Sequence, residues 1–208
     1  MSLRRIPRRV GAIAAGLLTA LAVAAAPAAA HPHPHPHTHD SLVGSALDGF
    51  VHPFIGLDHL AAMLAVGAIA ALAHPRRPVW AAPAAFVGAM IVGGAIGFGG
   101  IEIAGVEGVI AASVLVAGAI LLAARRAPLG WWLLPLVALA GAAHGNAHGL
   151  EAPEAAVPVA YVIGFVLATG ALHAAGAVIG VAMRRVDLGR IVAGTLLAVL
   201  GATLVFGT

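Results

Sequence analysis

The chain has 208 residues, of which 61% are hydrophobic and only 9% are charged. Soluble domains carry about 25% charged residues, so this composition excludes a soluble globular domain and indicates a protein of the lipid bilayer. Cysteine and lysine are both absent, which excludes thiolate chemistry and a lysine-containing phosphate loop. The pI is about 11.0, but the basic residues are arginines in short, separated groups. That pattern does not favour nucleic-acid binding.

The first thirty residues have the layout of a secretory signal peptide. Four arginines precede an apolar run over residues 10–26, and the small residues Ala28, Ala29 and Ala30 follow it. We expect cleavage after Ala30. The alternative is an uncleaved first helix, although the run is alanine-rich and short for a membrane span.

A histidine-rich tail follows over residues 31–44. Over residues 31–40 its imidazoles alternate mainly with proline, and these residues offer no apolar side chain to a core except proline. We expect a solvated, periplasmic tail that captures divalent cations weakly at several sites, and a plain spacer is the alternative. The capturing residues would be His31, His33, His35, His37 and His39.

Six apolar runs, each near the length of about 20 residues that crosses a bilayer, make up the rest of the chain. They cover about 46–73, 79–99, 104–124, 130–150, 156–183 and 190–207. We therefore expect an all-α polytopic membrane protein, with a domain of six transmembrane helices over residues 45–208.

The charged residues between the runs indicate the orientation of these spans. Arginines occur in alternate connections, at Arg76, Arg77, Arg125, Arg126, Arg184, Arg185 and Arg190. Glutamates occur at the opposite ends, at Glu102, Glu107, Glu151 and Glu154. Because cytoplasmic loops carry the excess of positive charge, we expect a bacterial inner-membrane protein whose mature N-terminus and C-terminus both face the periplasm.

A first polar cluster lies in the first run, where residues 52–59 read H-P-F-I-G-L-D-H. A charged group at the centre of a span costs roughly 2.5–3.5 kcal/mol, so such a cluster needs a functional reason. On a continuous helix His59 lies two turns deeper than His52 and on the same face. Asp58, at the edge of that face, would either bind a metal directly if the helix loosens at Gly56 or orient an imidazole.

A second cluster lies in the fourth run, where residues 144–151 read H-G-N-A-H-G-L-E. Spacings of four and three residues place His144, His148 and Glu151 on one stripe of a helix. A pair of histidines at this spacing suits one divalent ion. For either cluster alone, hydrogen bonds between helices are the alternative.

The predicted span directions match the two clusters in depth. The first span runs inward and the fourth runs outward, so His59 and His144 both fall near the middle of the membrane. His52 and Glu151 both fall nearer the periplasm. We therefore expect the two spans to be antiparallel neighbours that build one site open to the outside.

Two further ionisable residues remain. His173, near the middle of the fifth run, would either line the same route or satisfy a neighbouring carbonyl group. Glu107, at the outer start of the third run, would either lie in the mouth of the route or join the site.

The motifs H-P-x-x-G-x-D-H and H-G-x-A-H-G-x-E, in this order, resemble those of the HupE/UreJ family of bacterial nickel/cobalt permeases. The signal peptide and the six spans are also similar to that family. The resemblance implies nickel first and cobalt next as the metal. It implies as ligands His52, Asp58, His59, His144, His148 and Glu151. Many family members carry an aromatic residue where this chain has Ala143, a difference that would alter the width of the route.

We expect a secondary-type permease that imports Ni²⁺ or Co²⁺ from periplasm to cytoplasm and needs no prosthetic group. Imidazole and carboxylate ligands suit Zn²⁺ equally, so coordination chemistry alone does not choose the metal. The alternative is an intramembrane metal sensor or accessory subunit. A metallohydrolase is disfavoured, because Gly145 stands where a zinc-protease helix has its glutamate. The expected partners are the metal ion and the bilayer, and the sequence leaves a homo-oligomer open.

Overall fold

The computed structural model describes residues 41–73, 78–124, 130–153 and 156–207. The described residues form helices and no strand, so the predicted all-α class is confirmed. The predicted signal peptide and the histidines of the tail lie outside the described residues.

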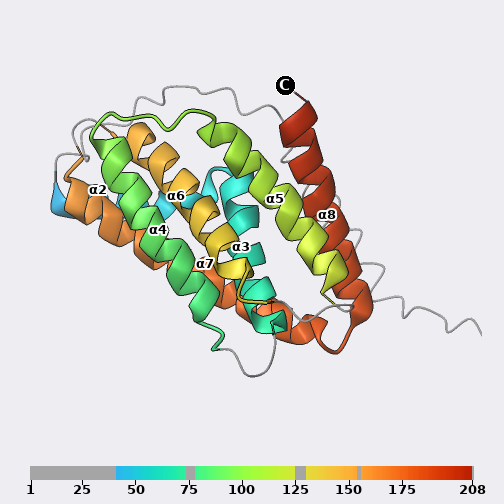
Figure 1. Ribbon diagram of the computed structural model, residues 1–208. Coiled ribbons are helices and arrows are strands. Elements are labelled where there is room, and N and C mark those ends of the chain that lie inside the picture. The colour runs from blue at the N-terminus through green and yellow to red at the C-terminus, as the bar shows by residue number, and fades with distance from the viewer. Residues whose placement is uncertain (1–40, 74–77, 125–129, 154–155, 208) are drawn as a thin grey trace, which may run out of the picture. The chain divides into compact units, whose positions relative to one another are not determined.

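Seven α-helices and one short 3₁₀-helix account for most of the described chain (Figure 1). They are α2 (Leu42–Val51), η1 (His52–Phe54), α3 (Leu57–Leu72), α4 (Ala81–Phe98), α5 (Val106–Ala123), α6 (Leu133–Glu151), α7 (Pro158–Met183) and α8 (Asp187–Phe206).

Four of these helices, α4, α5, α7 and α8, are long and apolar enough to cross a membrane. The bent segment formed by α2, η1 and α3 supplies a fifth candidate if it counts as one span. Helix α6 has 19 residues, but His144, Asn146 and His148 lower its mean hydropathy. The described residues thus contain four or five candidate spans by length and composition, and the count of six stays a prediction.

The first predicted span, 46–73, is not one continuous helix. Helix α2 ends at Val51, Pro53 lies in the 3₁₀ turn, and the backbone at Gly56 is extended before α3 begins. The two parts meet at an angle of 81°. Proline has no amide proton to donate and clashes with the preceding turn, which explains the break. The expectation that His52 and His59 share one face of one helix is therefore wrong.

Glycines bring α4 and α6 into close contact along their whole length. A Cβ atom on Gly145 would overlap the carbonyl oxygen of Met90, and one on Gly141 would overlap that of Phe86. From the other side, a Cβ on Gly93 would overlap the carbonyl oxygen of Ala142. Small residues of this kind let helix backbones approach one another within a membrane.

The same packing joins α7 to α2 and α3, and α5 to α8. A Cβ on Gly67 of α3 would overlap the carbonyl oxygen of His173, and one on Gly176 of α7 would overlap that of Leu64. Contacts within the α4–α6, α3–α7 and α5–α8 pairs are much denser than contacts between α3 or α7 and α4. Figure 1 shows α4 beside α6 and α5 beside α8, with α3 between these two pairs.

Two arginines of the predicted cytoplasmic side close the ends of helices. Arg190, at the start of α8, donates from Nη1 to the carbonyl oxygens of Leu121 at 2.6 Å and Leu122 at 2.7 Å. Arg184, at the end of α7, donates to the carbonyl oxygen of Ala71 at the end of α3. These three bonds satisfy carbonyl groups that a helix leaves unpaired at its C-terminus, so the arginines have a structural role in addition to their positive charge.

Candidate metal centre

The two polar clusters predicted from the sequence meet in space. The ring centroids of His59 and His144 are 5.0 Å apart, and those of His59 and His148 are 4.2 Å apart. The ring of His52 lies 4.6 Å from that of His148. The main neighbours of α3 and α6 are other helices, α7 for α3 and α4 for α6. The imidazoles therefore bridge the space between two separately packed helix pairs.

One group of ligand atoms surrounds the carboxylate of Glu151 at the end of α6. Its Oε2 lies 3.1 Å from Nε2 of His52 and 3.8 Å from Nδ1 of His148. One ligand atom from each of these three residues lies within 4.8 Å of the others. The helical spacing of His148 and Glu151 and the 3₁₀ turn that carries His52 together create this arrangement, which suits a divalent cation.

The second group is formed by the ring nitrogens of His59 and His144. Nδ1 of His59 bonds Oδ1 of Asp58 at 2.7 Å, and Nδ1 of His144 bonds the carbonyl oxygen of Ala140 at 2.8 Å. Because a carboxylate and a carbonyl accept hydrogen bonds, each Nδ1 carries the proton and each Nε2 presents its lone pair. Both Nε2 atoms are buried and without a hydrogen-bond partner.

Asp58 holds His59 through two hydrogen bonds. Its Oδ1 accepts from the ring of His59 at 2.7 Å and from the backbone amide of the same residue at 2.9 Å. The sequence left two roles open for Asp58, direct metal binding or the orientation of an imidazole. This geometry matches the second role. A Cβ on Gly56 would lie 2.7 Å from Nδ1 of His59 and 2.9 Å from Oδ1 of Asp58, so a larger residue there would disturb the pair.

The site is buried inside and carries acidic residues at one end. His59, His144 and His148 are buried, whereas the side chain of Glu151 is 53% exposed. Glu107, exposed in the first turn of α5, interacts electrostatically with Glu151, Asp58 and His59. The carboxylates therefore create a negative field at the end where His52 and Glu151 lie, and such a field concentrates cations.

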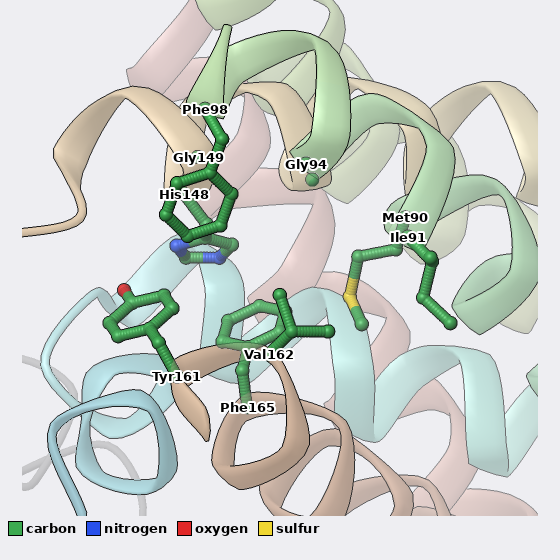
Figure 2. A pocket seen from close by; sticks show the side chains of 10 residues that line it. Met90, Ile91, Gly94, Phe98, His148, Gly149, Tyr161, Val162 and Phe165 are labelled. Atoms are coloured by element: carbon green, nitrogen blue, oxygen red, sulfur yellow. The ribbon is translucent and has the colours of Figure 1, made fainter. Parts of the chain in front are cut away.

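Three aromatic side chains line an apolar pocket next to His148. Figure 2 shows Phe98 of α4, together with Tyr161 and Phe165 of α7, around the imidazole of His148. The ring centroid of Phe165 lies 4.3 Å from that of His148. The hydroxyl of Tyr161 is buried without a partner, and its ring lies 6.0 Å from that of His52. These side chains exclude water from one side of the site.

Sequence reasoning missed the structural role of Asn146. Its Nδ2 donates to the carbonyl oxygen of Ile101 at 2.8 Å, and its Oδ1 accepts from the amide of Ile103 at 2.9 Å. These bonds fix the connection between α4 and α5 against the α6 segment that carries both histidines. An amide within a predicted span, where an unsatisfied polar group is costly, was the signal that could have indicated this role.

His173 and Ala143 lie apart from the cluster of site imidazoles. His173 is buried on α7, where its ring contacts Phe86. Ala143 is buried in a cluster with Val106 and Ile110 of α5. This position belongs to the packing of α6 on α5, and its effect on the width of the route stays a prediction.

Comparison with known proteins identifies the family. The profile described as "HupE / UreJ protein" matches residues 19–204. The chain belongs to this HupE/UreJ family. Its similarity extends to the protein named Protein HupE from Rhizobium leguminosarum bv. viciae, with 37% identity over 165 residues that cover 77% of this chain and 84% of that protein. No solved structure matches the chain significantly.

The family assignment supports part of the functional expectation. HupE/UreJ proteins are of a transporter type rather than an enzyme class, and they are associated with nickel and cobalt transport or with urease and hydrogenase maturation. Together with the apolar helices, this membership makes the chain a membrane protein associated with metal transport.

Proposed function

We propose that this protein is a secondary-type permease that imports Ni²⁺, or Co²⁺, from the periplasm into the cytoplasm. The ion passes through a site whose ligands come from His52, His59, His144, His148 and Glu151. Asp58 fixes the orientation of His59. The protein needs no prosthetic group, since the metal ion is its cargo.

The observation that carries this proposal is the set of buried imidazole nitrogens that lack a hydrogen-bond partner. Nε2 of His59, Nε2 of His144 and both ring nitrogens of His148 are in this state. A polar group buried without a partner costs about 1–3 kcal/mol, and three such rings in contact have no purely structural advantage. A divalent cation would accept their lone pairs and remove that cost.

In this proposal the metal ion meets the ligands one after another, from the open end of the site to its interior. Glu107 and Glu151 attract the hydrated cation to the open end, and the His-rich tail raises its local concentration. His52, His148 and Glu151 then replace part of its hydration shell, and His59 and His144 take it deeper. Imidazole and carboxylate ligands without thiolate suit Ni²⁺ and Co²⁺, and the family association selects these metals over Zn²⁺.

The membrane arrangement that suits this function has six spans in the inner membrane after a cleaved signal peptide. Helix α6 is the fourth span, and its polar residues face the other helices, since His144, Asn146 and His148 are all buried. The broken segment of α2, η1 and α3 is the first. The arginine-rich connections then lie in the cytoplasm, and both mature termini lie in the periplasm.

The deciding experiment measures radiolabelled nickel and cobalt uptake by the purified protein in liposomes, with and without an imposed potential. Empty liposomes and the His144→Ala variant serve as controls. We expect time-dependent uptake by the wild-type protein that exceeds the uptake in both controls. Specific binding without accumulation inside the vesicles would instead support the alternative, an intramembrane sensor or accessory subunit.

A metallohydrolase fits these residues less well. The helix with both histidines carries Gly145 where a zinc-protease helix needs a glutamate base, and Asn146 is the next residue. The side chain of Asn146 is also occupied by the connection between α4 and α5.

A further inference from the structure

The ring of Phe86 contacts both the candidate metal centre and a second buried imidazole. Phe86 lies on α4 and is fully buried. Its ring centroid is 5.4 Å from that of His144 and 5.3 Å from that of His173, with the Phe86 and His173 rings perpendicular. In the described part of the chain, no ring contact joins His144 directly to His173. The phenyl ring therefore contacts both imidazoles, which do not contact each other.

His173 has no structural bond that would account for its burial. It is 3% exposed, and neither Nδ1 nor Nε2 has a hydrogen-bond partner among the described residues. The structural alternative for a lone histidine in a span, a hydrogen bond to a neighbouring carbonyl, is thus not realised. Its position is fixed by close packing, since a Cβ on Gly67 of α3 would overlap the carbonyl oxygen of His173.

Two weaker metal donors lie one helical turn from His173 and Phe86. Thr169 precedes His173 by four residues on α7, and Met90 follows Phe86 by four residues on α4. The Oγ1 of Thr169 lies 3.9 Å from the Sδ of Met90, and both side chains are buried. A hydroxyl oxygen, a thioether sulfur and an imidazole therefore lie on the facing surfaces of α4 and α7.

We propose that His173 is an inner binding station for the transported divalent cation and that the Phe86 ring is the barrier between this station and His144. The inference rests on the proposed transport function. In this proposal, the phenyl ring blocks the movement of an ion from His59 and His144 to His173. Rotation of that ring joins the two imidazoles into one polar passage.

The inner station offers fewer ligands than the outer centre, and this difference allows it to release the ion. The outer centre offers four imidazoles, whereas the inner station offers the single imidazole of His173. An ion at the inner station is stabilised against the apolar surroundings but held by fewer strong ligands, so it leaves readily. The Phe86 ring prevents the outer centre and the inner station from forming one continuous open pore.

The first test removes the inner imidazole. The His173→Ala variant should lower the maximal rate of nickel uptake in liposomes by about tenfold, while the nickel affinity of the purified protein stays within about twofold of wild type. His173→Cys restores a ligand and should recover part of the rate. Leu172→Ala, which truncates the adjacent buried side chain, is the control for packing. Equal rates in His173→Ala and Leu172→Ala would overturn the inner station.

The second test changes the barrier. Phe86→Ala should raise the downhill flux of nickel severalfold, whereas Phe86→Leu, which keeps an apolar side chain of similar bulk, should stay near the wild-type flux. An unchanged flux in a folded Phe86→Ala variant would show that the ring is not a barrier.

A third measurement does not depend on transport. The chain has no cysteine, so His173→Cys has a single thiol whose alkylation by N-ethylmaleimide can be followed in detergent. Cd²⁺ should slow this alkylation, but not that of Leu172→Cys. If the wild-type protein moves no metal and Cd²⁺ still protects His173→Cys, the transport function fails and the station stands. If the wild-type protein transports and no protection is seen, the station fails alone.

Discussion

At the scale of single residues, the unprotonated nitrogens of His59 and His144 are selected by their hydrogen-bond partners. Asp58 and the carbonyl oxygen of Ala140 each fix the proton on Nδ1. Metal-binding histidines commonly have such a partner, which orients the ring and raises its basicity. A change of partner should therefore weaken metal binding even though every candidate imidazole remains.

Asp58→Asn tests this role of the carboxylate. The amide of asparagine can donate a hydrogen bond to Nδ1. That bond favours the tautomer in which Nε2 carries the proton, so Nε2 then has no lone pair for a metal ion. We expect nickel affinity to fall by about 10–100-fold in an equilibrium titration of the purified protein. Asp48→Asn removes one negative charge from α2 and is the matched control. Equal losses in both variants would mean that Asp58 acts only through its charge.

His59→Ala and His144→Ala test whether the two rings bind one ion. Their centroids are 5.0 Å apart, so each substitution alone should remove most nickel uptake. The double variant should be scarcely worse than either single variant, since ligands of one site are not additive. Uptake rates in liposomes provide the measurement. Additive losses would mean that the rings belong to separate stations.

The sequence was sufficient to predict which side chains could meet, because helical spacing and span direction depend on local periodicity. His59 with His144 and His52 with Glu151 are the pairs expected from depth, and they are neighbours in the structure. The hydrogen-bond partners of Asn146 and the position of Phe86 could not be predicted. Both depend on how α4 and α5 pack against α6, and no spacing within a single helix specifies that.

At the scale of helices, the break at Pro53 and Gly56 determines where His52 and His59 lie. A straight helix would keep His52 and His59 two turns apart on one line. The 81° bend instead brings both rings into contact with His148 of α6. The sequence contained the local signal, a proline three residues before a glycine. The direction of the bend depends on the packing of α2 and α3 against α7, which periodicity does not report.

Gly145→Ala tests the close contact between α4 and α6. The added Cβ would overlap the carbonyl oxygen of Met90, so the helices must separate. We expect the free energy of unfolding to fall by about 1–3 kcal/mol, as measured by SDS titration of the purified protein. Gly88→Ala is the matched control on α4, because a Cβ there meets nothing within 4 Å. If the two variants proved equally stable, glycine packing would not hold this pair together.

At the scale of the whole molecule, the candidate ligands are divided between two tightly packed helix groups. His59 and His173 belong to the α3–α7 pair, and His144, His148 and Glu151 belong to the α4–α6 pair. Because the contacts between the pairs are sparse, they can shift relative to each other without disrupting either one. Membrane transporters commonly alternate access by rocking one such bundle against another. A shift of this kind would separate the outer ligands and move Phe86 relative to His173.

This motion can be blocked by a bridge between the pairs. Ile91 of α4 and Val162 of α7 line the same pocket (Figure 2), and the absence of native cysteine permits an Ile91→Cys, Val162→Cys variant with only two thiols. A short bis-maleimide that joins them should lower nickel uptake by about tenfold or more, because movement between the pairs would then require a covalent bond to stretch.

The control for this bridge is N-ethylmaleimide on the same double-cysteine variant, which fills the pocket without joining the helices. It should leave most of the uptake intact, and mass spectrometry should establish that the bridge has formed in the other sample. Bridged protein that still transports at the rate of the N-ethylmaleimide sample would show that the two pairs move as one body. The ion would then have to pass Phe86 by rotation of that side chain alone.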